Sequence, residues 1–237
     1  MKHLLLFASL ATAAALAAPS PFPGPRGDTL DLAAREDMWD RPPRGFLGEF
    51  VRVPRDQVVG FALYSHDQGT LKLSAQLYPL KPDETREVRL ELETGGAWRE
   101  VARAPVLYPG WSAHFRITPW SGREDVRYRV RHGTAAMFEG LIRKAPIGKE
   151  VIVVGSLSCD SNKDRGDRAE IVQKLKQQDP DLLFFSGDQS YDHMEHTAAW
   201  LLWGAHFRDI IKDRPVVTIP DDHDIGQGNV WGEGGIV

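Results

Sequence analysis

The sequence DLLFFSGDQSYD spans residues 181–192 and decides the fold of the second half of the chain. Its apolar run, residues 181–185, predicts a short strand that is buried on both faces, as strands of parallel sheets are. The run closes on Gly187 and then on polar residues, among them Asp188 and Tyr191. Open α/β sheets place their ligand sites at the carboxyl ends of their strands. The stretch therefore predicts a strand that delivers polar side chains to a site.

Two further strands of the same kind are predicted on either side, at residues 151–155 and 215–219. A helix is expected after the first, because Asp167 stands as an N-cap with Glu170 three residues later. A second helix is expected over residues 195–212, where the aromatic and aliphatic residues form an apolar face. Alternating strands and helices predict parallel strands that are joined by right-handed crossovers.

Residues 46–146 follow a different period. Val88, Leu90 and Leu92, for example, alternate with charged residues, which is typical of a strand with one buried face. About seven such segments, separated by turn signals, predict an all-β sandwich of the fibronectin or immunoglobulin type. The chain has one cysteine, so the cysteine pair of immunoglobulin domains is missing and the fibronectin-like form is favoured. The predicted fold is this sandwich followed by a partial α/β domain in residues 147–237.

The N-terminal residues have the pattern of an export signal. Lys2 and His3 precede an apolar run, and residues 15–17 form an A-x-A-like cleavage site, so residues 1–17 are predicted to be a signal peptide. Residues 18–45 are rich in proline and glycine and are predicted to be a linker. No other stretch approaches the ~20 apolar residues of a membrane span. We expect a secreted or periplasmic protein without a transmembrane segment after signal cleavage.

The composition excludes one class of partner. Hydrophobic residues make up 42% of the chain and charged residues 26%, which is ordinary for a globular protein. The formal net charge is −4. Because nucleic-acid binding leaves a basic footprint, no nucleic acid is expected as a specific partner.

The three predicted strands end in three polar clusters, at residues 158–162, 187–193 and 221–224. Together these clusters contain several carboxylates, a thiol, a phenol and imidazoles. Such a density of carboxylates repels itself unless cations lie among them, and a two-metal centre that clamps phosphoryl oxygens meets that need. Donors of oxygen, nitrogen and sulfur indicate that a transition metal belongs to the pair.

Two of these clusters carry a family resemblance. Gly187-Asp188-x-x-Tyr191-Asp192 and the run at residues 221–224 resemble the signatures of calcineurin-like metallophosphoesterases. The Ser-Cys pair at residues 158–159 is similar to the PhoD (alkaline phosphatase D) variant, in which a β-sandwich commonly precedes the catalytic domain. The resemblance implies a phosphatase or phosphodiesterase that hydrolyses phosphate esters.

The resemblance also implies a ligand set. Asp188 would bridge both metals, and Cys159 and Tyr191 would bind iron, the more oxidised ion. Asp222 would bind a second metal, either calcium or another divalent ion. Asn229 would be a further ligand.

The catalytic residues implied are His223 and Asp224. His223 would donate a proton to the leaving oxygen, and Asp224 would polarise it. Residues 160–162 offer a competing first ligand, because they mirror the Asp-x-His of the wider superfamily.

Several alternatives stay open. Cys159 could be a plain buried cysteine, Tyr191 a packing residue and Asn229 part of a turn. His193 and His196 could reach a phosphate or a metal, but solvated or pocket-wall histidines are the more common case.

The family's later Gly-His-x-His segment has no counterpart in the sequence. We therefore expect an N-terminal fragment of a longer enzyme that is weakly active or inactive alone. A second reading is a secreted fibronectin-like binding module whose acidic rim binds calcium. Cys159 and Tyr191 distinguish the two, because a calcium site uses hard oxygen ligands.

Overall fold

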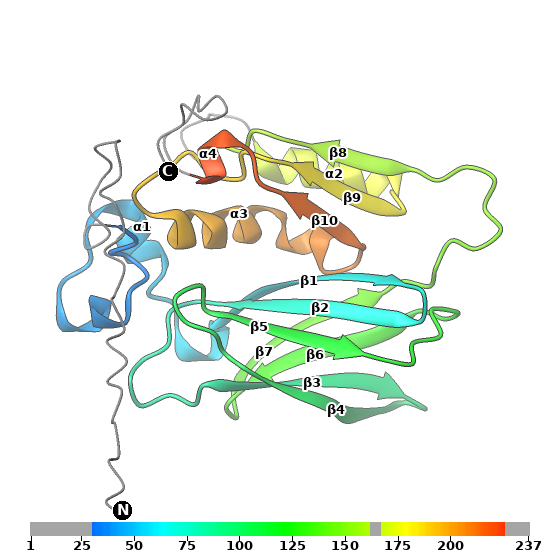
Figure 1. Ribbon diagram of the computed structural model, residues 1–237, viewed down its shortest axis with the longest axis horizontal. Helices are drawn as coiled ribbons and strands as arrows, with labels where there is room; N and C mark the ends of the chain where they lie inside the picture. The colour runs from blue at the N-terminus through cyan, green and yellow to red at the C-terminus, as the bar shows by residue number, and fades with distance from the viewer. Residues whose placement is uncertain (1–29, 162–166, 226–237) are drawn as a thin grey trace, which may run out of the picture.

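The computed structural model describes residues 30–161 and 167–225, which form a two-sheet β domain and a smaller α/β unit (Figure 1). The predicted signal peptide lies outside these residues. Within the same two ranges, no helix combines the length and the hydropathy that crossing a bilayer requires.

The β domain consists of two antiparallel sheets whose inward side chains share one hydrophobic core. One sheet has the order β1-β2-β5, formed by Val59–Asp67, Thr70–Leu77 and Ser112–Ile117. The other has the order β4-β3-β6-β7, formed by Ala97–Pro105, Glu87–Thr94, Val126–His132 and Ala136–Ile142. In β3, Val88, Leu90 and Leu92 are all buried, as predicted, but Glu91 between them is buried as well. The assignment to the fibronectin or immunoglobulin type stays a prediction.

The α/β unit has three parallel strands in the order β10-β9-β8. Its elements are β8 (Val154–Leu157), α2 (Arg168–Gln178), β9 (Leu182–Ser186), α3 (His196–Ile211), β10 (Val216–Ile219) and the short α4 (Asp222–Ile225). The predicted N-cap is confirmed, because the Asp167 carboxylate accepts from the backbone N–H groups of Ala169 and Glu170. Both crossovers run in the same direction across the sheet, so α2 and α3 lie on the same face, where they contact each other.

The opposite face of the parallel sheet is open. Val154, Val217 and Ile219 are 49%, 40% and 45% exposed, whereas Leu183 and Phe185 point to the helices and are buried. The prediction that these strands are buried on both faces is therefore wrong for the described residues. The reason is the topology, because two crossovers in one direction place both helices on one side.

The first strand also begins later than predicted, at Val154 rather than Val151, and Val151 is exposed. In α2, Val172 and Leu175 are buried, but Ile171 is exposed. An apolar run alone does not show which of its residues find a partner, because that depends on the layers above and below it.

The same substitution at two neighbouring positions of β10 tests the open face. Val216→Thr, on the helix side, is expected to lower the free energy of unfolding by about 1–2 kcal/mol, because it buries a hydroxyl without an added partner. Val217→Thr, on the open face, is expected to change it by less than about 0.5 kcal/mol. Urea unfolding of both variants measures the difference, and equal losses would contradict an open face.

Helix α3 joins the two parts of the molecule, since it packs against β1 as well as against the parallel sheet (Figure 1). Phe61 of β1 meets Trp200 and Trp203 of α3 with ring centroids 5.7 and 5.8 Å apart. Trp203 in turn meets Phe185 of β9 at 4.8 Å. The aromatic contacts therefore run without a break from the β domain to the strand that ends at the polar cluster.

The segment that follows residue 30 is packed, not extended. It contains a 3₁₀ helix, Glu36–Asp40, and is followed by α1 (Gly45–Phe50) and by a second 3₁₀ helix, Arg55–Gln57. Met38 is buried, and Asp31 accepts hydrogen bonds of 2.8 Å from the backbone N–H and the hydroxyl of Thr197 at the start of α3. This corrects the linker predicted for residues 18–45 in the part that the structure describes. A few apolar residues are enough to pack this segment, because the rest of the chain provides the surface that covers them.

Candidate metal centre

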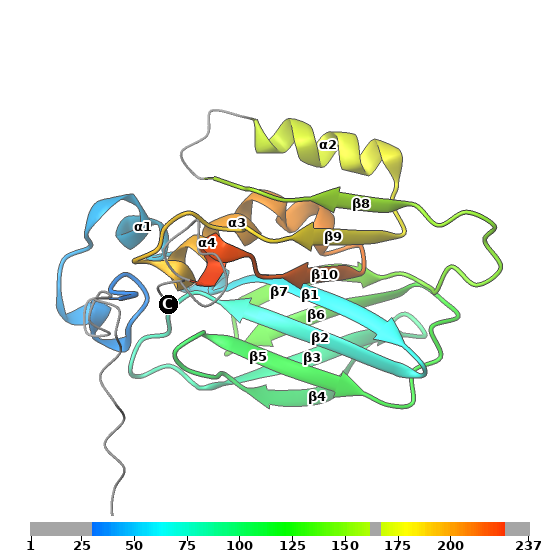
Figure 2. The same ribbon diagram turned by 45° about the horizontal axis from the view of Figure 1, so that its top comes forward.

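The loops that follow β8, β9 and β10 meet at one end of the parallel sheet, beside α4 (Figures 1 and 2). The backbone N–H of Cys159 donates to the Gly187 carbonyl at 3.2 Å, and that of Asp160 donates to the Asp188 carbonyl at 2.8 Å. Gly187 has a φ of +97°, and a Cβ there would lie 2.3 Å from Cβ of Asp221. Only glycine fits where the ends of β9 and β10 pass so closely.

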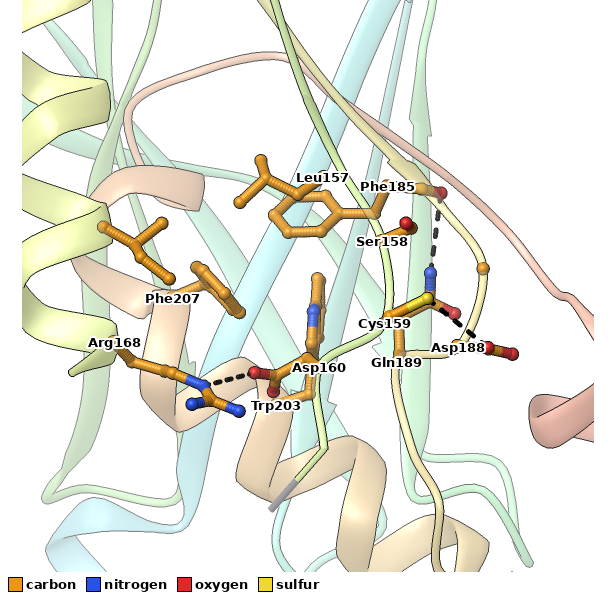
Figure 3. Close-up of a pocket in the computed structure, with 12 residues that line it drawn as sticks. Leu157, Ser158, Cys159, Asp160, Arg168, Phe185, Asp188, Gln189, Trp203 and Phe207 are labelled. Carbon is orange, nitrogen blue, oxygen red and sulfur yellow. Dashed lines mark hydrogen bonds and ion pairs between the residues drawn. The ribbon is translucent and has the colours of Figure 1, made fainter. Parts of the chain in front are cut away.

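Asp188 lies at the centre of the site. Its side chain is buried, and its Oδ2 accepts from the Tyr191 hydroxyl at 2.9 Å. The same oxygen accepts from the Cys159 thiol at 3.6 Å (Figure 3). Its Oδ1 accepts from the backbone N–H of His223 at 3.3 Å. Asp188 and Cys159 both adopt a positive φ, of 55° and 61°, which is uncommon for residues other than glycine. The loops thus hold two strained residues face to face, as is frequent at functional sites.

Three of the predicted site residues are arranged as metal ligands. Asp188, Asp222 and His223 each offer a ligand atom, and these atoms lie within 4.8 Å of one another. Two carboxylates and an imidazole suit a divalent transition metal, and the neighbouring thiol of Cys159 and phenol of Tyr191 suit a softer or more oxidised ion. The residues present therefore fit the metal centre that the sequence predicts.

Burial raises the pKa of the Tyr191 phenol above the ordinary value, and the hydrogen bonds with Cys159 and Asp188 raise it further. A bound cation would act in the opposite direction, because a positive charge favours the phenolate.

His223 has an unpredicted partner. Nε2 of His193 lies 2.8 Å from Nδ1 of His223, and the two rings stack with centroids 5.1 Å apart. The Tyr191 ring lies on His223 as well, at 4.1 Å. The predicted partner of His223 was Asp224. The one signal for His193 was its position in the polar cluster that follows the second predicted strand.

Asp224 serves the backbone instead. Its carboxylate accepts from the N–H groups of Asp188 at 2.6 Å, Asp221 at 3.0 Å and Ser190 at 3.2 Å. Burial raises the pKa of Asp224, and the nearby Asp188 charge adds to this effect. The prediction that Asp224 polarises His223 is corrected accordingly, because successive residues of α4 point in different directions. Asp224 is a positioning residue that holds the β9 and β10 loops together.

The competing ligand at residues 160–162 is not supported where it is described. The Asp160 carboxylate accepts from Nε of Arg168 at 2.6 Å (Figure 3). It also lies 3.2 Å from Nδ1 of His206, so other partners hold it. Cys159 is exposed, which excludes a plain buried cysteine. Asn162 and Asn229 lie outside the described residues.

Comparison with known proteins supports the fold. No family model and no curated protein matches the chain. A solved structure of PhoD matches with a TM-score of 0.58 at 16% sequence identity, over 76% of this chain and 42% of that one.

The chain resembles PhoD in fold. A purple acid phosphatase from yellow lupin (Lupinus luteus) seeds also matches, with a TM-score of 0.52 at 16% identity, over 73% of this chain and 36% of that protein. The chain thus spans less than half the length of either structure. At this identity the likeness establishes the fold, and the chemistry must be argued from the residues.

Proposed function

We propose that this chain belongs to a secreted, metal-dependent phosphoesterase of the PhoD type. The single observation that carries the proposal is the convergence on Asp188, which brings Cys159, Tyr191, Asp222 and His223 to one carboxylate. The two similar structures are a PhoD and a purple acid phosphatase, which supports a phosphatase at the coarse level. The substrate would be a phosphate ester.

The donor set supports a centre of two metals. Asp188 would contact both ions, Cys159 and Tyr191 would hold iron, and Asp222 would hold calcium or another divalent ion. Metals in such a centre neutralise the charge on the phosphoryl oxygens.

The remaining groups would handle the proton. His193 engages Nδ1 of His223, so Nε2 is the imidazole atom through which His223 would meet the leaving oxygen or an ion. Asp224 would keep the two loops in register through its backbone hydrogen bonds.

The alternative is a fibronectin-like binding module with a calcium site. The thiol and the phenol on Asp188 disfavour it, because calcium sites are built from hard oxygen donors. Export through residues 1–17 and the fibronectin type of the β domain are part of the proposal.

Metal analysis of the purified chain tests the function. We expect iron or another transition metal to be retained through dialysis. We expect p-nitrophenyl phosphate to be hydrolysed slowly, because the three clustered ligand atoms of the described residues do not complete the coordination of two ions. Retention of calcium alone, without hydrolysis, would favour the binding module. No retained or rebound metal of any kind would overturn both readings.

A further inference from the structure

A cavity of about 420 Å³ opens beside the metal centre, on the helix side of the parallel sheet (Figure 3). Its volume lies within the range of sites for small molecules. The described residues that line its apolar part come from β8, α2, β9 and α3, and they are Leu157, Ile171, Phe185, Trp203 and Phe207.

The apolar part of the cavity is preformed. Phe185 lies edge-on to both Trp203 and Phe207, with centroids 4.8 and 5.2 Å away. All three rings are almost fully buried, so they fix the floor of the cavity, and Leu157 and Ile171 supply its accessible apolar lining. Ile171 is different, because its side chain is 39% exposed on α2.

The polar wall of the cavity is shared with the metal centre. Cys159 and Asp188 both line it, and they are the pair joined by the 3.6 Å hydrogen bond. Asp160 is the other acid on the wall, and Arg168 neutralises it through an ion pair of 2.6 Å. A ligand that places an anionic group at Asp188 and its metals would therefore extend its remaining part along the apolar side chains of Leu157 and Ile171 without facing an unpaired carboxylate.

We infer that this cavity receives the organic group of the ester, and that the substrates are phosphate esters of bulky apolar alcohols. The inference rests on the proposed function, which places the phosphoryl group at the metals beside Asp188. A sugar or another polyol would exchange hydrogen bonds with water for contacts with apolar side chains, which is unfavourable. An apolar group gains from the same exchange.

Phosphonates that are not hydrolysed test the inference by binding alone. The full chain, loaded with Mn²⁺, would be titrated calorimetrically with methylphosphonate and with 1-naphthylphosphonate. We expect the naphthyl compound to bind at least about tenfold more tightly, because it buries a large apolar area in the cavity. Ile171→Trp, which narrows the cavity from an exposed position, should remove most of this preference while methylphosphonate affinity changes less than about twofold.

Val101→Trp is the matched control, since Val101 is similarly exposed but lies on β4 in the other domain. It should leave both affinities unchanged. Equal affinity for the two phosphonates would overturn the inference that the cavity receives the organic group, and so would a preference for the naphthyl compound that survives Ile171→Trp. Either result would leave the proposed function intact. Failure to bind Mn²⁺ or methylphosphonate would instead overturn the proposed function, and the inference with it.

Discussion

Asp188→Asn is expected to abolish tight metal binding while the chain stays folded. The carboxylate has the central place in the site, and replacing it removes one negative charge and one ligand atom. The loss in affinity should be about 100-fold or more, since even partners outside the direct ligands contribute about 10–100-fold. Isothermal titration with Mn²⁺ measures it, and the small phosphatase activity should disappear with the metal.

The fold should tolerate this change. Asn adopts the positive φ of Asp188 readily and is nearly the same size, so the free energy of unfolding should change by less than about 1 kcal/mol without metal. Asp209→Asn is the matched control, because Asp209 lies on the exposed side of α3 and pairs only weakly with Lys212, at 3.8 Å. Unaltered metal affinity in Asp188→Asn would contradict the proposed centre.

Gly204→Ala is expected to destabilise the molecule strongly, although alanine is the better helix former. A Cβ at this position of α3 would lie 1.9 Å from Cε1 of Phe61, and Phe61 is buried with its ring edge-on to Trp200 and Trp203. The ring cannot move without disturbing the core, so we expect a loss of about 3 kcal/mol or more, against a gain of about 1 kcal/mol in helix propensity. For a domain of this size, a net loss of about 2 kcal/mol lowers Tm by roughly 4–8 °C.

Circular dichroism during heating measures this loss. Gly110→Ala is the control, because the nearest atom to its added Cβ is the Ser112 hydroxyl at 3.8 Å. That variant should unfold within about 2 °C of the parent, since its Cβ meets no crowded atom. If Gly204→Ala unfolded at the parent's temperature, α3 could not lie against β1 as closely as the structure shows.

Much of the site could be predicted because its signals are local. Asp188, Tyr191 and Asp222 stand directly after apolar strands, and parallel strands deliver their carboxyl ends to one edge. The cap at Asp167 and the alternation of Val88, Leu90 and Leu92 likewise depend on residues a few positions apart.

The errors in prediction concern contacts over long separations. Asp224 was expected to serve its neighbour His223, but it binds the backbone of a loop 36 residues away, and His193 takes its place 30 residues from His223. No periodicity or spacing links such pairs, because their meeting depends on how the two loops pack.

By itself, the sequence determined the two kinds of sheet, the order of the elements and the residues that reach the strand ends. Hydrophobic period, capping and chain direction determine these features, and all of them act over a few residues. Only the tertiary structure decided which face of the parallel sheet stays open, which partner each acid and histidine finds, and that an aromatic cavity adjoins Asp188. Those features depend on surfaces that become adjacent only when α3 packs against β1 and the strand-end loops close on one another.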